Sequence, residues 1–265
     1  MTVSAGGCAY SQDEGNCIGT GISWSCAELD EALTGPIARA LFDCEGISEI
    51  EELIYGTEET EFSVNAIRDV FGGDGPTENW RVGEAIAETF LADHRGCFFP
   101  WPMSRDERKR GSSLPGADLV GLQDTGGGDR LVFGEAKTSK DRNSPPGVIY
   151  GATGLRQQML ELRDQRPLRN RLIKYLAFRA RGADWAPRYR NATQRYLRDP
   201  EDVQLFGFLV RDTHPNCDDI RRTVFKLADG CPEQICIELI ALYLPTGSID
   251  RLAATVIQSI DGSDS

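Results

Sequence analysis

Closely spaced metal-binding cysteines and histidines are missing from this sequence. Its 265 residues include only 2 histidines, and no two of its 8 cysteines form a Cys-x-x-Cys pair. Structural zinc sites depend on such closely spaced Cys and His ligands. We therefore expect reduced thiols, and neither a zinc nor an iron–sulfur centre.

Long apolar runs are also absent. No stretch approaches the roughly 20 residues that a membrane-spanning helix needs. The opening residues MTVSAGGCAYSQDEGN lack the basic and apolar regions of a secretory signal. A hydrophobic share of 40% is nevertheless enough for a folded core. We expect a cytoplasmic protein with no membrane partner.

Positive charge is scarce in the first third of the chain. Residues 1–99 carry 4 Lys/Arg and 19 Asp/Glu, whereas residues 100–200 carry 20 Lys/Arg and 11 Asp/Glu. The overall net charge of -12 argues against binding of nucleic acid. Phosphate binding depends on local charge, however, and the middle third of the chain supplies local positive charge. The acidic third has three interpretations: a solubilising surface, a cover over the basic groove, or a docking face for a basic partner. The asymmetry favours docking.

The sequence divides into an acidic extension and a domain with mixed periodicity. Residues 1–25 show no clear period and are expected to be irregular, while the patterns at 26–42 and 62–72 predict helices. We therefore expect an N-terminal extension, irregular and then helical, over residues 1–77. Residues 78–265 are expected to form an α/β domain.

Helical and strand patterns in this domain predict a mixed central sheet flanked by helices, an α/β (α+β) fold. The strands are expected at 97–101, 117–123, 130–136, 203–210 and 235–244, and the helices at 78–93, 150–164, 168–181, 187–197, 217–228 and 248–260.

An aspartate and a Glu-x-Lys sequence lie on two of these strands, which a glycine-rich turn joins into a hairpin. Alternation along the second strand places Glu135 and Lys137 on the same face, with Asp118 on the facing strand. Two carboxylates can hold a hard divalent cation such as Mg²⁺ or Mn²⁺. A lysine beside them can orient water or stabilise a phosphate. The pattern therefore predicts metal-dependent cleavage of a phosphodiester.

Two further groups would complete the metal shell. The backbone carbonyl of Ala136 would point toward the site, and Glu84 would reach it from the helix at 78–93; Glu88, which shares a face with Glu84, is the less favoured choice. The candidate catalytic residues are Glu84, Asp118, Glu135 and Lys137. The candidate metal ligands are Glu84, Asp118, Glu135 and Ala136.

Basic residues interleaved with apolar ones follow the site. Arg163, Arg166, Arg169 and Lys174 are candidates for contacting DNA. The same spacing fits the solvated face of ordinary amphipathic helices, so both interpretations stay open.

The segments Gly83-Glu84, Pro115-Gly116-Ala117-Asp118 and Glu135-Ala136-Lys137 together resemble the PD-(D/E)XK nuclease superfamily. The resemblance covers residues 80–210, with Gly-Ala inserted between the proline and aspartate of the family's Pro-Asp. It implies a restriction-endonuclease-like core and a Mg²⁺- or Mn²⁺-dependent endonuclease acting on DNA. RNA remains an alternative substrate. Gln157 or Gln158 is similar to a glutamine that some branches carry on the next helix.

Within the superfamily, the runs RVGEAIA, SLPGADLVG and GEAKTS look like the small nuclease subunit of Hachiman-type antiphage systems. That resemblance implies an effector in bacterial defence that works in a complex with a helicase. The competing hypothesis is a catalytically silent nuclease-fold subunit that binds DNA or restrains a partner.

Overall fold

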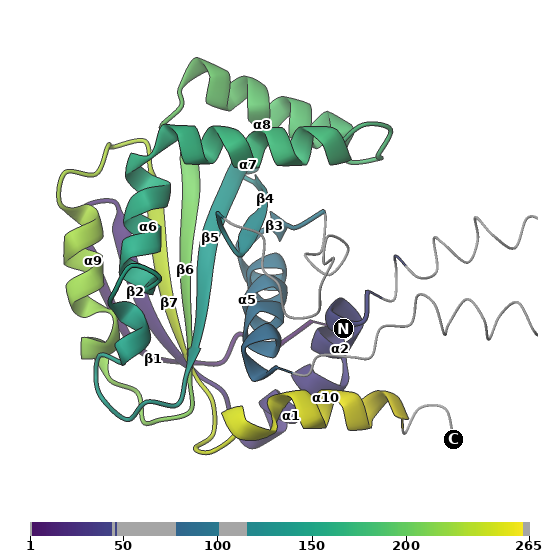
Figure 1. The fold of residues 1–265 in the computed structure, drawn as a ribbon, viewed down its shortest axis with the longest axis vertical. Helices are drawn as coiled ribbons and strands as arrows, with labels where there is room; N and C mark the ends of the chain where they lie inside the picture. The colour runs from purple at the N-terminus through teal and green to yellow at the C-terminus, as the bar shows by residue number, and fades with distance from the viewer. Residues whose placement is uncertain (1, 44–45, 47–77, 101–115, 262–265) are drawn as a thin grey trace, which may run out of the picture.

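A computed structural model describes residues 2–43, 46, 78–100 and 116–261 of the chain. These residues form a seven-stranded sheet with helices against both faces, which confirms the predicted α/β class (Figure 1). None of the described helices combines the length and apolar character that crossing a bilayer requires. The helix predicted at 62–72 lies outside the described residues.

The sheet is mixed, with the strand order β1-β2-β7-β6-β5-β4-β3. Its strands are β1 (Gly7–Glu14), β2 (Cys17–Ser23), β3 (Cys97–Phe98), β4 (Leu119–Asp124), β5 (Asp129–Ser139), β6 (Val203–Arg211) and β7 (Cys236–Tyr243). Strands β2, β7, β6 and β5 run parallel, whereas β1, β4 and β3 are antiparallel to their neighbours. Every residue of β6 is buried, as predicted for a central strand.

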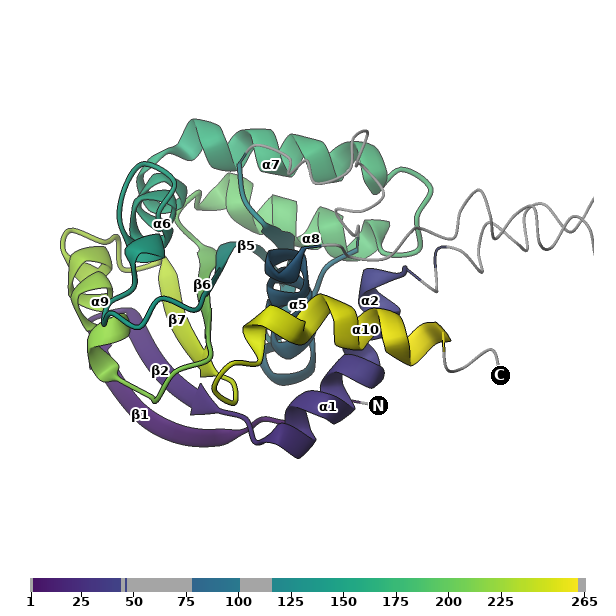
Figure 2. The same cartoon turned by 60° about the horizontal axis from the view of Figure 1, so that its bottom comes forward.

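Two hydrophobic cores lie on opposite faces of this sheet. One contains residues of α1 (Cys26–Thr34), α2 (Pro36–Leu41), α5 (Asn79–Arg95) and α10 (Leu252–Asp261). The other contains residues of α6 (Leu155–Asp164), α7 (Arg166–Arg179), α8 (Ala186–Arg198) and α9 (Arg221–Ala228). Figure 2 shows the two groups of helices on either side of the strands.

Side-chain alternation explains how the central strand β6 contributes residues to both hydrophobic cores. Along β6, Phe206 and Phe208 belong to the α5 side, while Leu205 and Leu209 belong to the α6 side. Neighbouring side chains on a strand point to opposite faces, so a central strand buried on both faces is mostly apolar. This is why the sequence of β6 reads as a hydrophobic run, with Gln204 and Arg211 as its buried polar residues.

The helices predicted from apolar periodicity are confirmed, with small shifts at their ends. The break predicted at Gly35-Pro36 separates α1 from α2. Helix α6 begins at Leu155 rather than at residue 150, because the chain turns first at Gly151 with a φ of 85°. Short 3₁₀ turns occupy Gly147–Ile149, Cys217–Asp219 and Ile249–Arg251.

The prediction that residues 1–25 are irregular is wrong, because they supply β1 and β2, and β2 pairs with β7. The inward positions of β2 include glycines, which hide the apolar alternation of a strand. A Cβ on Gly19 would lie 2.7 Å from Val224 Cγ2 of α9, and one on Gly21 would overlap the Tyr10 ring. These close approaches leave room only for glycine.

Candidate active site

The β4–β5 hairpin brings Asp118 and the Glu-x-Lys sequence together. The register pairs Leu119 with Gly134, so Asp118 stands at the start of β4 beside the next part of β5. Its carboxylate Oδ2 accepts a hydrogen bond from the backbone N–H of Ala136 at 3.0 Å. This bond fixes the aspartate against β5 and confirms the predicted proximity of the two motifs.

Glu135 is a buried carboxylate that is only partly satisfied. The residue is 1% exposed, and its Oε1 lies 2.5 Å from Nζ of Lys137. Its Oε2 has no hydrogen-bond partner in the described part of the chain. Burial, followed by the adjacent Asp118 carboxylate, raises the pKa of Glu135, while Lys137 opposes the rise. Added positive charge would therefore stabilise this group of carboxylates.

Helix α5 carries Glu84 to the same place. The preceding residue, Gly83, lies so close to β5 that a Cβ would overlap Oγ1 of Thr138. Burial and the Asp118 carboxylate, with a smaller effect of Glu135, raise the pKa of Glu84, while Arg81 and Lys137 lower it. The structure thus brings all four candidate catalytic residues within electrostatic reach of one another.

These residues fit a divalent cation in part. Asp118 and Glu135 offer hard oxygen ligands, and Oε2 of Glu135 is buried beside the Asp118 carboxylate without a donor to it among the described residues. The N–H of Ala136 points to Asp118. The N–H and C=O of one residue in an extended strand point to the same edge of the strand, so the carbonyl of Ala136 also faces the side of Asp118. Across the described ranges, no three His, Cys, Asp or Glu side chains are already grouped as a metal shell.

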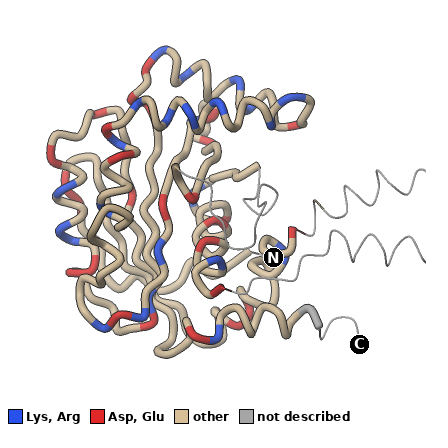
Figure 3. The backbone as a smooth tube through the Cα atoms, viewed as in Figure 1, with Lys and Arg blue, Asp and Glu red and all other residues tan. Residues whose placement is uncertain are grey.

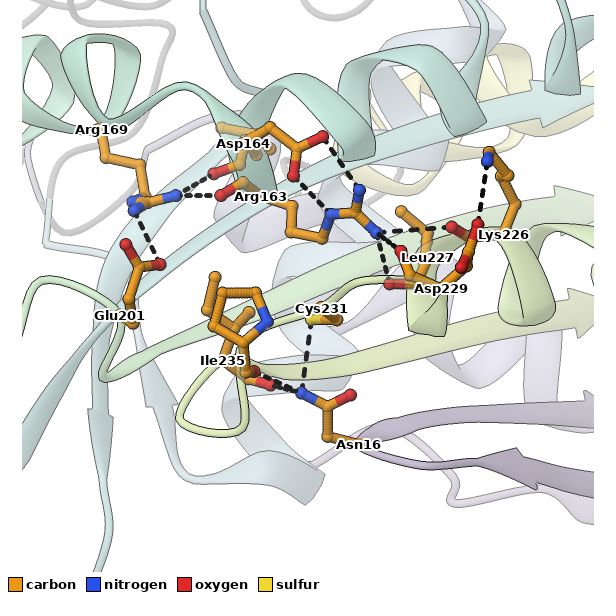
Figure 4. Close-up of polar contacts among 12 residues, drawn as sticks. Asn16, Arg163, Asp164, Arg169, Glu201, Lys226, Leu227, Asp229, Cys231 and Ile235 are labelled. Carbon is orange, nitrogen blue, oxygen red and sulfur yellow. Dashed lines mark hydrogen bonds and ion pairs between the residues drawn. The ribbon is translucent and has the colours of Figure 1, made fainter.

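Two of the four candidate DNA-binding residues have structural roles instead. Arg163 donates to the backbone carbonyls of Leu227 and Asp229 at 2.8 and 2.9 Å, which ties α6 to α9 (Figure 4). Arg169 is 1% exposed and donates to the carbonyls of Leu162 and Arg163. The prediction that these two arginines contact DNA is wrong. Their buried guanidinium groups donate hydrogen bonds to backbone carbonyls at the ends of helices, where no backbone N–H is available.

The exposed cations of α7 lie elsewhere on the helix. Arg166 and Lys174 are exposed, as predicted, and Arg171 is exposed beside them. Figure 3 shows basic residues spread along α7 and α8. A phosphate backbone near this pair of helices would meet Arg166, Arg171 and Lys174.

A cavity of about 480 Å³ adjoins the carboxylates, a feature that motif reasoning missed. Asp118 and Glu88 both line it, so Glu88 lies beside the site rather than away from it. Burial, with a smaller effect of Asp43, raises the pKa of Glu88 to about 7. The only sequence signal for the cavity is a helical repeat in α6 and α7, whose lining residues recur every three or four positions.

No protein-family model matches the chain, and no curated protein matches its sequence.

Proposed function

We propose that this protein is a metal-dependent endonuclease that hydrolyses DNA. The observation that carries the proposal is the buried Glu135–Lys137 pair beside Asp118, with one carboxylate oxygen left without a partner. Two buried carboxylates side by side disfavour each other's charge, so without a ligand they tend to keep a proton that a divalent cation would replace. A divalent cation supplies the missing charge.

Each residue has a distinct task in this proposal. Asp118, Glu135 and the carbonyl of Ala136 would hold Mg²⁺ or Mn²⁺, and Glu84 would complete the shell from α5. The ion supplies Lewis-acid stabilisation of the phosphate and lowers the pKa of bound water. Lys137, anchored by Glu135, would orient the attacking water or stabilise charge that develops on the phosphate.

The wider biological role rests on the sequence resemblance. The resemblance of its motifs to PD-(D/E)XK nucleases, and among them to the small Hachiman subunit, favours an effector subunit in bacterial antiphage defence, working in a complex with a helicase. The mixed sheet with the motif on adjacent strands is compatible with a restriction-endonuclease-like core. The exposed cations of α7 support a nucleic acid as the ligand.

Incubation with plasmid DNA and with a single-stranded DNA oligonucleotide tests the activity directly. Purified protein is incubated with Mg²⁺, Mn²⁺ or EDTA, alone and with its helicase partner, and a structured RNA is run in parallel. Cleavage that requires the metal supports the nuclease, and the RNA lane decides between substrates. Metal binding without any product, even with the partner present, would favour a silent DNA-binding subunit.

Lys137→Met is expected to slow cleavage by about 10²-fold, because a preorganised donor to the developing phosphate charge is lost. Lys140→Met is the matched control, since Lys140 lies on the same segment but is exposed and pairs with Asp250 at 2.6 Å. Both variants are assayed under single-turnover conditions. Equal rates for the two variants would remove Lys137 from the proposed mechanism.

The pH dependence of stability is expected to reveal the raised pKa of the buried carboxylates. The pKa of Glu84 rises from 4.5 in an unfolded chain to about 8 in the folded protein, so between these values the folded state binds more protons. Its contribution to stability is full at low pH and is lost as the pH rises through the folded pKa. In EDTA, Glu84→Gln should therefore gain melting temperature relative to the wild type as the pH rises. A difference that is constant with pH would contradict the assignment.

A further inference from the structure

Helices α6 and α7 each turn one face toward the cavity that adjoins the carboxylates. On α6 and the residue after it, the lining residues recur at three- and four-residue steps: Gln158, Glu161 and Gln165. On α7 they recur in the same way: Leu168, Arg171, Leu172 and Tyr175. Residues at such spacing share one side of a helix. The two helices therefore form a continuous wall.

The lining of the cavity combines apolar side chains with a buried polar group. Phe99, Val120 and Leu172 line it with apolar surface, and Gln158 lines it as well. The Oε1 atom of Gln158 is buried and has no hydrogen-bond partner in the part of the chain that the structure describes. A ligand for this cavity should be apolar on its faces; a donor on its edge would reach Oε1 of Gln158 once that side chain turns toward the cavity. A volume of about 480 Å³ is large enough to take a nucleobase.

Asp118 connects the cavity to the proposed chemistry. It lines the cavity and also accepts the hydrogen bond from Ala136 beside Glu135. A nucleic acid whose phosphate lies at the carboxylates would hold its neighbouring base at the cavity. We propose that the cavity binds an unstacked nucleobase, and that the substrate is single-stranded nucleic acid. This inference rests on the proposed nuclease function and specifies its substrate class.

Helix α7 continues this surface beyond the cavity. Arg171 lies at its edge, Lys174 follows three residues later, and Phe178 follows seven residues later with 62% of its surface exposed. Cations that contact phosphates, alternating with an aromatic ring on which a base can stack, are the usual elements of single-strand binding. A base inside a duplex is already stacked and would first have to be flipped out. The arrangement therefore favours a single strand over a duplex.

The test compares two ligands that have the same phosphates but differ in their bases. Fluorescence anisotropy measures binding of a short oligothymidylate and of an abasic oligomer of equal length, in EDTA so that nothing is cleaved. Oligouridylate is the RNA arm. Wild-type protein is expected to bind oligothymidylate about tenfold more tightly than the abasic strand.

Two variants locate that preference. Val120→Phe fills the cavity from β4, and Gln158→Leu removes the buried acceptor; each should reduce the preference severalfold. Gln194→Leu is the control, because Gln194 is exposed on α8 and does not line the cavity. It should retain the wild-type preference. Melting temperatures confirm that each variant is folded, and the two cavity variants give independent readings.

The outcomes separate this inference from the nuclease proposal. Equal affinity for the two strands, failure to bind either of them, or a preference unchanged in both cavity variants would overturn the nucleobase site. Metal-dependent plasmid cleavage would then still support the nuclease. Conversely, base-dependent binding without any metal-dependent cleavage would retain the nucleobase site and remove the nuclease.

Discussion

Replacing Glu135 with glutamine is expected to reduce metal-dependent cleavage by about 10³-fold or more while the protein remains folded. The substitution keeps the size of the side chain but removes a charge from the proposed metal site, and such charge stabilisation is worth several kcal/mol in a metal-dependent transition state. Because burial raises the pKa of Glu135, a neutral amide should be tolerated in the metal-free fold. Cleavage rate and melting temperature are measured on the same preparation.

The control for Glu135→Gln is Glu238→Gln. Glu238 is also a partly buried strand carboxylate, but it lies on β7 and pairs with Arg95 at 2.7 Å. Its loss should leave cleavage within about twofold of wild type, as for a site with no part in the chemistry. Addition of Mn²⁺ should raise the melting temperature of the wild type and of Glu238→Gln, and not that of Glu135→Gln. Full activity in Glu135→Gln would refute the site.

Gly83→Ala is expected to destabilise the protein by about 2 kcal/mol. The new Cβ would overlap Oγ1 of Thr138, so α5 must move away from β5. Glu84 is the next residue and would move with the helix, which should also lower activity. An alanine normally stabilises a helix interior relative to glycine by about 1 kcal/mol, so the sign of the effect is diagnostic. Urea denaturation measures the change.

A second substitution should rescue this variant. Thr138→Ala removes the hydroxyl and methyl groups and leaves its own Cβ as the nearest atom, 3.1 Å from the Cβ that an alanine would carry at position 83. The double variant Gly83→Ala/Thr138→Ala should therefore recover most of the stability, with a coupling energy of about 1–2 kcal/mol in a double-mutant cycle. Additive effects of the two substitutions would show that α5 is not held at this contact.

Local features of the sequence were enough to predict most elements and the centre of the site. Apolar periodicity located α5, and the continuous apolar run located β6, because each of these signals depends on neighbouring residues. The glycine turn between two alternating segments identified the β4–β5 hairpin. Once the hairpin is assigned, the pairing of its strands places Asp118 beside Ala136 and therefore beside Glu135.

Features that depend on distant partners required the tertiary structure. The glycines of β2 identify a strand only when α9 and the Tyr10 ring are seen against them. The charges of Arg163 and Arg169 suggested a ligand, but backbone carbonyls from other elements occupy their guanidinium groups.

The sequence by itself therefore determined the class of fold, the hairpin and the carboxylate–lysine motif, because these follow from residues close together in the chain. The tertiary structure decided which cations are available to a ligand and created the cavity beside Asp118. That cavity is formed by α5, β4, α6 and α7, which are separated in sequence and meet only in the folded protein. Long-range packing, rather than any local pattern, sets its shape.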